Sequence, residues 1–109
     1  MDLQLSGKTA LITGGSEGIG KGIAWGLAKE GVDIAICARR PEPLETTAQE
    51  IRDATSVKVV AIPTDLTNND QAKKFIEESA KQLGRVDIMV NNAGSSPGGV
   101  IEHLSEDDW

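Results

Sequence analysis

A glycine-rich segment directly follows a short apolar run near the start of the chain, and it constrains the fold more than any other feature. Residues 9–20 read Thr-Ala-Leu-Ile-Thr-Gly-Gly-Ser-Glu-Gly-Ile-Gly, and Ile19, Ile23 and Leu27 recur at helical spacing. The pattern predicts a buried strand that turns through glycines into a helix. The first N–H groups of a helix lack partners within it, and the helix dipole favours negative charge there. We therefore expect a phosphate-binding site.

The spacing Gly14-x-x-x-Gly18-x-Gly20 gives each glycine a separate expected role. Gly14 frees the chain as it leaves the strand, Gly18 leaves room for a pyrophosphate, and Gly20 lets the helix pack close to the sheet. An alternative is the P-loop pattern G-x-x-x-x-G-K-S/T, but Gly22 stands where that pattern needs a magnesium-binding hydroxyl. This mismatch disfavours nucleoside triphosphate binding. A turn without a ligand is the other alternative, and the strand and helix patterns on either side disfavour it.

Strand-like runs alternate with helical patterns along the chain. Strands are expected at 9–13, 33–38, 58–62 and 87–90, and helices at 18–29, 41–54 and from 67–70 to 83. We also expect a loop at 95–99 and a capped helix start at 105–108, with His103 in a loop-to-helix region between them. This alternation predicts the α/β class, with a parallel sheet covered by helices on both faces and right-handed crossovers.

Composition limits the classes of protein to which the chain can belong. Its 109 residues suit one small domain, and a net charge of −6 argues against a non-specific nucleic-acid surface or an anionic membrane surface. The apolar runs are too short to span a bilayer, and residues 1–4 show no signal-peptide pattern. Cys37 is the only cysteine, and its apolar flanks predict a buried strand residue. We expect a cytoplasmic protein without a metal site.

Four polar or glycine-rich segments follow the four expected strands, at the sheet edge where open α/β sheets bind ligands. They are Thr13 to Gly20, Ala38-Arg39-Arg40, Thr64-Asp65-Leu66-Thr67 and Asn91-Asn92-Ala93-Gly94. Together, in this order, they closely resemble the short-chain dehydrogenase/reductase family, which carries a T-G-x-x-x-G-I-G segment, an aspartate after the third strand and an N-N-A-G segment. The resemblance covers essentially the whole chain. It implies a doubly wound Rossmann-type sheet of order 3-2-1-4, truncated after the fourth strand, in one incomplete dinucleotide-binding domain over residues 1–109.

The resemblance also implies cofactor-binding roles for particular residues. The pyrophosphate would lie against Gly14, Ser16, Gly18, Ile19 and Gly20. Thr13 and residues 91–94 would tie strands together and line the cofactor. Asp65, followed by Leu66, would accept a hydrogen bond from the adenine amino group. The alternative for Asp65 is a turn or helix-capping role, and the alternative for Asn91 and Asn92 is a turn pair whose amides satisfy backbone groups.

The end of the second expected strand bears on the choice of cofactor. An NAD-selective site places an acid about 20 residues after the glycine segment, where this chain has Ala38, with Arg39 and Arg40 directly behind it. Arginine forks suit a 2′-phosphate, so we predict NADP(H), with NAD(H) as the alternative. Glu17 opposes this prediction, because NADP-dependent relatives often carry a basic residue just before the second glycine.

The resemblance places catalysis on a serine and a Tyr-x-x-x-Lys pair, and the chain has no tyrosine. We therefore expect no catalytic residue here and an inactive chain. Because its fourth strand would have an exposed apolar edge, we expect the chain alone to fold poorly, to aggregate or to need a partner segment. His103 has no expected catalytic role, and Trp25 and Trp109 are expected to pack on helices. The implied function is an oxidoreductase acting on a small-molecule carbonyl or alcohol, homo-oligomeric when intact. A non-catalytic dinucleotide-binding or sensor protein is the alternative.

Overall fold

The computed structural model describes residues 5–14, 18–92 and 100–103. Strands and helices alternate through these ranges. They are β1 (Thr9–Thr13), α1 (Gly18–Lys29), β2 (Asp33–Ala38), α2 (Pro41–Ala54), β3 (Val59–Pro63), α3 (Asn69–Leu83), β4 (Ile88–Asn91) and β5 (Val100–His103). The first seven elements match the expected alternation, although β3 and β4 each begin and end one residue later than the sequence pattern placed them.

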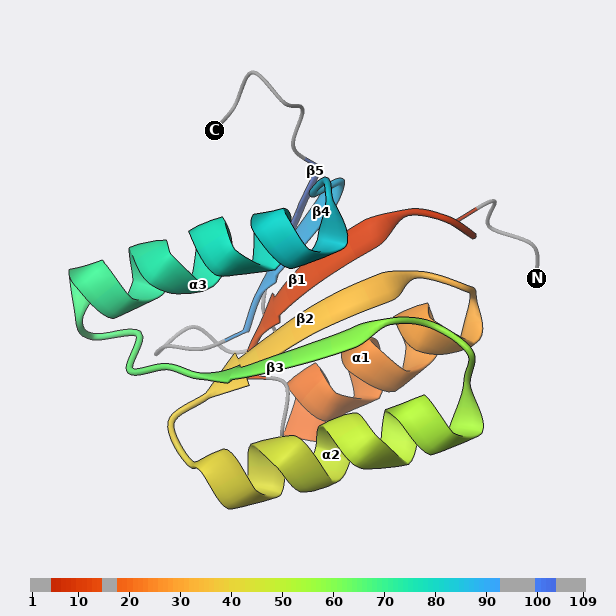
Figure 1. The fold of residues 1–109 in the computed structure, drawn as a ribbon, viewed down its shortest axis with the longest axis horizontal. Helices are drawn as coiled ribbons and strands as arrows, with labels where there is room; N and C mark the ends of the chain where they lie inside the picture. The colour runs from red at the N-terminus through yellow and green to blue at the C-terminus, as the bar shows by residue number, and fades with distance from the viewer. Residues whose placement is uncertain (1–4, 15–17, 93–99, 104–109) are drawn as a thin grey trace.

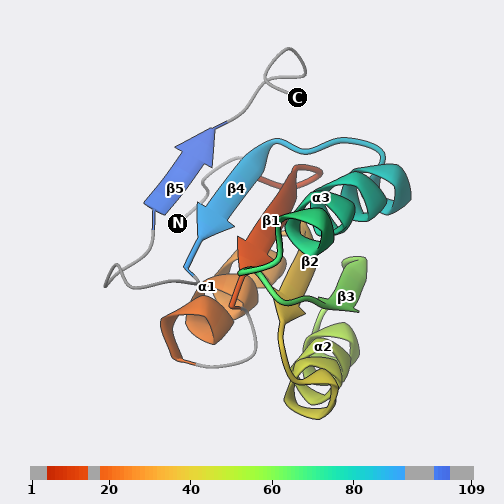
Figure 2. The ribbon, with the colours of Figure 1, turned by 90° about the vertical axis from the view of Figure 1, so that its left-hand side faces the viewer.

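The strands form one sheet in the order β3-β2-β1-β4-β5. The pairs β1–β2, β1–β4 and β2–β3 are parallel, which confirms the predicted order 3-2-1-4. Figure 1 shows α3 on one face of the sheet and α1 with α2 on the other, and Figure 2 shows the same three layers from the side. The doubly wound α/β architecture is therefore confirmed, and the carboxyl ends of β1 to β4 share one edge.

The fifth strand corrects part of the prediction. Val100–His103 pairs antiparallel with β4, so the outer edge of β4 is covered, and His103 lies in a strand rather than in a loop leading to a helix. The sheet does not stop after its fourth strand. Val100-Ile101-Glu102-His103 is neither a continuous apolar run nor an alternation of apolar and polar residues, so it gives no strand pattern, and the glycines and proline of 95–99 indicate a loop. The expectation of poor folding rested on an exposed edge of β4, and β5 covers that edge.

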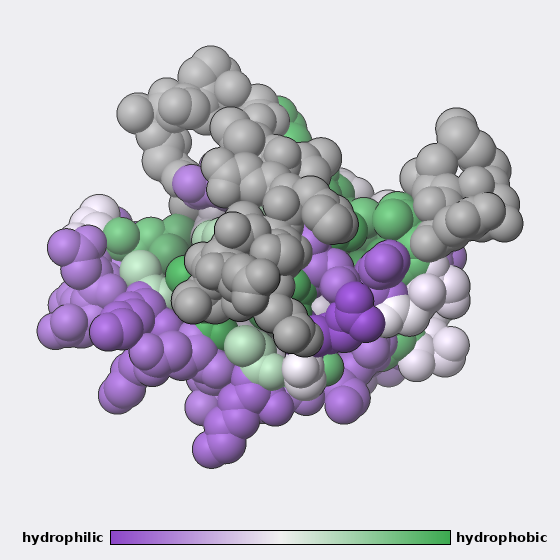
Figure 3. All heavy atoms as spheres, turned by 90° about the horizontal axis from the view of Figure 1, so that it is seen from above, coloured by the Kyte–Doolittle hydropathy of each residue, from purple (hydrophilic) through white to green (hydrophobic). Residues whose placement is uncertain are grey.

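The core divides into two layers because successive strand side chains point to opposite faces. On the α1 and α2 side it includes Ala10, Ile12, Ile34, Ile36, Leu44 and Ile51, and on the α3 side it includes Leu11, Ala35, Cys37, Val60 and Phe75. The buried position predicted for Cys37 is confirmed, and burial raises the pKa of its thiol to about 11. Figure 3, seen from above, shows hydrophilic side chains along the side where α3 lies.

One buried carboxylate fastens β1 to β4 at the amino end of the sheet. Asp87 is 7% exposed, and its Oδ2 accepts the backbone N–H of Thr9 at 2.9 Å. Its Oδ1 accepts hydrogen bonds from Arg85, at 2.9 Å from Nε. Burial alone would raise the pKa of Asp87, but the hydrogen bonds from Arg85 and Thr9 and the charges of Arg85 and Lys8 leave that pKa below its ordinary value.

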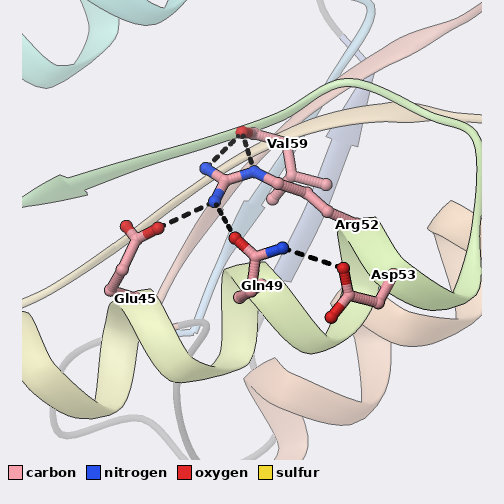
Figure 4. A network of polar contacts seen from close by, with 5 residues as sticks. All are labelled: Glu45, Gln49, Arg52, Asp53 and Val59. Carbon is pink, nitrogen blue, oxygen red and sulfur yellow. Dashed lines mark hydrogen bonds and ion pairs between the residues drawn. The ribbon is translucent and has the colours of Figure 1, made fainter.

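An arginine of α2 covers part of the free edge of β3. Hydrogen bonds from Ile34 N–H to the Lys58 carbonyl and from Thr64 N–H to the Ala38 carbonyl face β2, so by alternation the Val59 carbonyl faces outward. Arg52 donates to that carbonyl from Nε at 3.2 Å and from the second guanidinium nitrogen at 2.8 Å. Figure 4 shows the guanidinium also bound to Glu45, at 2.7 Å, and to Gln49.

Candidate functional site

Glycines bring the start of α1 close to the end of β1. Gly14 has a φ of 69° and Gly18 a φ of 57°, a left-handed conformation that favours glycine. A Cβ at Gly20 would overlap the Gly14 carbonyl oxygen and would lie 2.7 Å from Asn92 Nδ2. Gly20 therefore lets the helix approach the strand ends closely, as predicted. The first turn of α1 has no acidic side chain, and a helix N-terminus of this kind suits a phosphate group.

Ile19 is exposed at the start of α1. Its side chain is 57% exposed, and no other large hydrophobic residue in the described ranges is as open to solvent. Ile19 directly follows Gly18 at the start of α1, so an apolar side chain lies beside the backbone N–H groups of the first turn. A ligand with both a phosphate group and a flat organic ring could use both features.

A hydroxyl links the carboxyl ends of β1 and β4. Thr13 Oγ1 accepts the backbone N–H of Asn92 at 2.8 Å, and it lies 3.4 Å from the Val90 carbonyl and 3.2 Å from Asn91 Oδ1. Thr13 is buried, and Asn91 is exposed at the sheet edge. The link predicted between the two strands is therefore present. It also places the Asn92 side chain over Gly20, so β1, β4 and α1 meet at one point.

The turn after β3 presents Asp65 at the same edge of the sheet. Asp65 Oδ1 accepts hydrogen bonds from Thr67, at 3.0 Å from the backbone nitrogen and at 2.6 Å from the hydroxyl. These two hydrogen bonds hold the pKa of the Asp65 carboxyl below its ordinary value, and the positive charge of Arg39 acts in the same direction. Asp65 thus has the turn role that was its alternative. Among the described residues, no hydrogen bond reaches its Oδ2, so this oxygen remains available to a ligand.

Arg39 and Arg40 follow β2 and are exposed. Arg40 precedes the first residue of α2, where Pro41 starts the helix without a side-chain cap. β2 ends at Ala38, so the strand end carries no carboxylate. β2 and β3 are neighbouring parallel strands, so Arg39 and Asp65 follow adjacent strand ends. The positive charge of Arg39 favours the ionised form of the Asp65 carboxyl.

Three of the predicted site residues line one cavity on the α3 side of the sheet. Its volume is about 270 Å³, and Thr13, Leu66 and Asn91 line it together with Ala72, Phe75, Ile76 and Met89. The predicted residues Ser16, Glu17, Ala93 and Gly94 lie outside the described residues, so their roles stay predictions. The expected packing of Trp109 and the helix start at 105–108 also lie outside. Trp25 packs against the core and takes a cation–π contact from Lys29, 5.7 Å from its ring centre.

Sequence reasoning missed one residue of this edge. Gln71 Oε1 accepts the backbone N–H of Asp65 at 2.8 Å. The signal available was a glutamine three residues after Asn68, which caps α3 by accepting the N–H groups of Asp70 and Gln71. A glutamine at this position commonly reaches back over the helix start.

The described residues contain no group of three or more His, Cys, Asp or Glu side chains that could hold a metal ion. Within the same residues, no helix is both long and apolar enough to cross a membrane.

Comparison with known proteins gives one consistent result. Residues 8–109 match the family model described as short chain dehydrogenase. The chain is 39% identical over 102 residues to 11-beta-hydroxysteroid dehydrogenase-like 2 of Arabidopsis thaliana, covering 94% of this chain and 33% of that protein. It is 38% identical to a 3-oxoacyl-(acyl-carrier-protein) reductase of Staphylococcus epidermidis, covering 94% of this chain and 42% of that protein.

A solved structure shows the same relation in three dimensions. L-Sorbose reductase from Gluconobacter frateurii, complexed with NADPH and L-sorbose, superposes with a TM-score of 0.83 at 36% identity, over 100% of this chain and 41% of that one. The chain thus spans between a third and about two fifths of the length of these relatives. On the family match, the sequence identities and the shared fold, the chain belongs to the short chain dehydrogenase family.

Proposed function

We propose that the chain is the cofactor-binding part of an oxidoreductase that uses NADP(H) to transfer hydride to or from a carbonyl or secondary alcohol. One observation carries the proposal. The glycine-rich start of α1, the Thr13–Asn92 link and Asp65 lie together at the carboxyl ends of parallel strands, where α/β sheets of this kind bind dinucleotides. The nicotinamide would supply or accept the hydride, and the protein would bind and orient it.

The proposed contacts follow the geometry of the edge. The pyrophosphate would lie at the N-terminus of α1 against the backbone of Gly14, Ser16, Gly18, Ile19 and Gly20, where N–H groups without helical partners can bind it. Asp65 Oδ2 would accept a hydrogen bond from the adenine amino group, beside Leu66. Thr13 and residues 91–94 would line the cofactor. The absence of a Cβ at Gly20 and of acidic groups in the first turn of α1 supports this fit.

The preference for NADP(H) rests on the end of β2. Ala38 offers no carboxylate to a ribose 2′-hydroxyl, and the exposed guanidinium groups of Arg39 and Arg40 can pair with a 2′-phosphate. The sorbose reductase was solved with NADPH, and a similar alcohol dehydrogenase from Thermococcus sibiricus was solved with 5-hydroxy-NADP. Glu17 would have to point away from the phosphate or pair with an arginine.

Dissociation constants of NADPH and NADH, measured on the intact protein, test this preference. We expect NADPH to bind more tightly, and Arg39→Leu to weaken NADPH about ten-fold or more, because a charge-assisted hydrogen bond contributes roughly 1.5–3 kcal/mol. NADH binding should change little in the same variant. Lys73→Leu removes a positive charge on the outer side of α3 and serves as the control. Tighter binding of NADH by the wild-type protein would contradict the preference.

A non-catalytic dinucleotide-binding or sensor protein is the second candidate, because the same fold can bind a dinucleotide without catalysing a reaction. The discriminating measurement is NADPH oxidation by the intact protein with a panel of small carbonyl compounds. Tight cofactor binding without turnover of any of them, and without a Ser and Tyr-x-x-x-Lys set in the intact protein, would favour the sensor. We further propose a homo-oligomeric, cytoplasmic protein, and sedimentation analysis and cell fractionation test these two points.

A further inference from the structure

We propose that Gln71 is a positioning residue for the adenine end of the dinucleotide, a role that rests on the proposed function. Gln71 is the third residue of α3, and its Oε1 accepts the backbone N–H of Asp65 at 2.8 Å. The bond spans the turn that joins β3 to α3. It therefore fixes the backbone of the residue whose carboxylate is assigned to adenine.

The turn is held at both of its ends. On the sheet side, the backbone N–H of Thr64 donates to the Ala38 carbonyl at 2.8 Å, and Thr64 is 3% exposed. On the helix side, the backbone N–H of Gln71 donates to Asn68 Oδ1 at 3.2 Å while its side chain returns to Asp65. Asp65 lies between these two anchors, so the direction of its backbone is set before a ligand arrives.

The Asp65 carboxylate is oriented as well. Its Oδ1 is bound by the backbone and the hydroxyl of Thr67. Thr67 holds one carboxylate oxygen of Asp65, and Gln71 holds the backbone N–H of the same residue. Together these hydrogen bonds orient Oδ2, the oxygen that would accept a hydrogen bond from the ligand. A preorganised acceptor loses less entropy when it binds a ligand. Gln71 thereby acts on affinity through Asp65, without touching the ligand itself.

The exposure of Gln71 separates this role from a purely structural one. The Gln71 side chain is exposed and Asp65 is half-buried, and the hydrogen bond between them is open to solvent. Loss of the Gln71 oxygen would leave the Asp65 N–H open to water rather than buried and unpaired, so the cost in folding stability should be small. The effect should fall on the binding of the adenosine half of the cofactor.

The experiment uses the intact protein and compares a ligand that contains the adenosine half of the cofactor with one that lacks it. Dissociation constants are measured for NADPH and for reduced nicotinamide mononucleotide, with melting temperatures alongside. Gln71→Met keeps the length of the side chain and removes the acceptor, whereas Gln71→Glu keeps the acceptor. Gln82→Met is the matched control, because it makes the same change on an exposed residue near the other end of α3. Salt of about 0.3 M limits the effect of the charge that Gln71→Glu adds.

We expect Gln71→Met to weaken NADPH binding roughly five-fold, the loss of one ordinary hydrogen bond. Gln71→Glu should stay within about two-fold of wild type, and Gln82→Met should change nothing. Binding of the mononucleotide should be the same in all four proteins. Equal NADPH binding in Gln71→Met and wild type would overturn the positioning role, as would equal losses for both ligands or a Gln71→Glu variant as weak as Gln71→Met. A wild-type protein that binds no NADPH would instead overturn the proposed function.

Discussion

Asp87 joins two segments that are far apart in the chain with a single carboxylate. It accepts the backbone N–H of Thr9 and pairs with Arg85 while almost wholly buried. Asp87→Asn removes the charge from these bonds and turns one oxygen into a donor that faces other donors. We expect the free energy of unfolding at pH 7 to fall by about 2 kcal/mol. Urea denaturation of the intact protein measures it, and Asp53→Asn, on the exposed surface of α2, is the control.

The same carboxylate should make stability depend on pH in a defined direction. The pKa of Asp87 is lower in the folded protein than in the unfolded chain. Its stabilisation is therefore complete above the unfolded pKa of about 3.9 and is lost as pH falls through the lower folded pKa. The difference between wild type and Asp87→Asn should shrink as pH falls from about 5 to 3. A constant difference across that range would show that the charge of Asp87 is not the cause.

Ser79 carries a hydroxyl that the fold leaves without a partner. Its Oγ is fully buried on the sheet-facing side of α3, and no hydrogen bond to it is found among the described residues. Ser79→Ala removes this unpaired group and also favours the helix. We expect the free energy of unfolding to rise by about 1 kcal/mol. Lys81→Ala, at an exposed position of the same helix, controls for helix propensity, and a Ser79→Ala variant less stable than wild type would contradict the prediction.

At the scale of the element, two glycines of α1 should respond in opposite ways to the same change. A Cβ at Gly20 would overlap the Gly14 carbonyl, whereas a Cβ at Gly22 would meet nothing within 4 Å. Gly20→Ala should force α1 away from the strand ends and weaken both folding and cofactor binding. Gly22→Ala should stabilise the helix by about 0.5–1 kcal/mol without loss of NADPH affinity. Thermal melts and NADPH titrations of the two variants form the test, and similar behaviour of the pair would refute it.

Arg52 should protect the free edge of β3. Its guanidinium occupies the outward Val59 carbonyl, and Pro63 at the end of the strand has no N–H to offer a neighbour. Arg52→Met removes the cover while keeping much of the side chain. We expect slow self-association at concentrations where the wild type does not associate, visible by light scattering and sedimentation. Lys73→Met, on the opposite face, is the control, and a variant that stays as dispersed as the control would contradict this role.

Much of the element order could be predicted from the sequence, because apolar runs and helical stripes are local signals. Helix boundaries were also predictable, since Pro41, Asn68 and Gly84 mark helix ends by their own chemistry. β5 was not predictable, because its pairing depends on the edge of β4 rather than on a pattern of its own. The pairing of Asp87 with Thr9 was not predictable either: the Asp87 backbone N–H donates to the Thr9 carbonyl and the Asp87 side chain accepts the Thr9 N–H, contacts between distant residues that no local pattern shows.

The site residues that belong to a sequence motif could be predicted. Residues whose role depends on a hydrogen bond to another part of the turn could not. Gly20 and Thr13 have the structural roles expected of them. Asp65 holds its own turn through Thr67, the alternative given for it, and its role toward adenine stays a prediction. Gln71 was missed because its partner is a backbone N–H six residues earlier, which depends on how the turn folds.

At the scale of the whole molecule, β1 is the central strand of the sheet. It has a hydrogen-bonded neighbour on each side, and Ala10, Leu11 and Ile12 are completely buried. Amide hydrogens of such a strand exchange only when large parts of the fold open. We therefore expect the amides of residues 10–12 to exchange more slowly than those of the edge strand β3, as followed by mass spectrometry. Faster exchange in β1 than in β3 would contradict the observed strand order.

The two links between β1 and β4 also set an order of events during synthesis of the protein. The Thr9–Asp87 and Thr13–Asn92 hydrogen bonds join residues 78 and 79 positions apart. A nascent chain that leaves the ribosome from its N-terminus can pair β1 with β2 early, but one side of β1 stays bare until β4 has been made. For that interval the central strand of the finished sheet is an edge strand, open to wrong partners. Chaperones that bind extended apolar segments would have their best opportunity there.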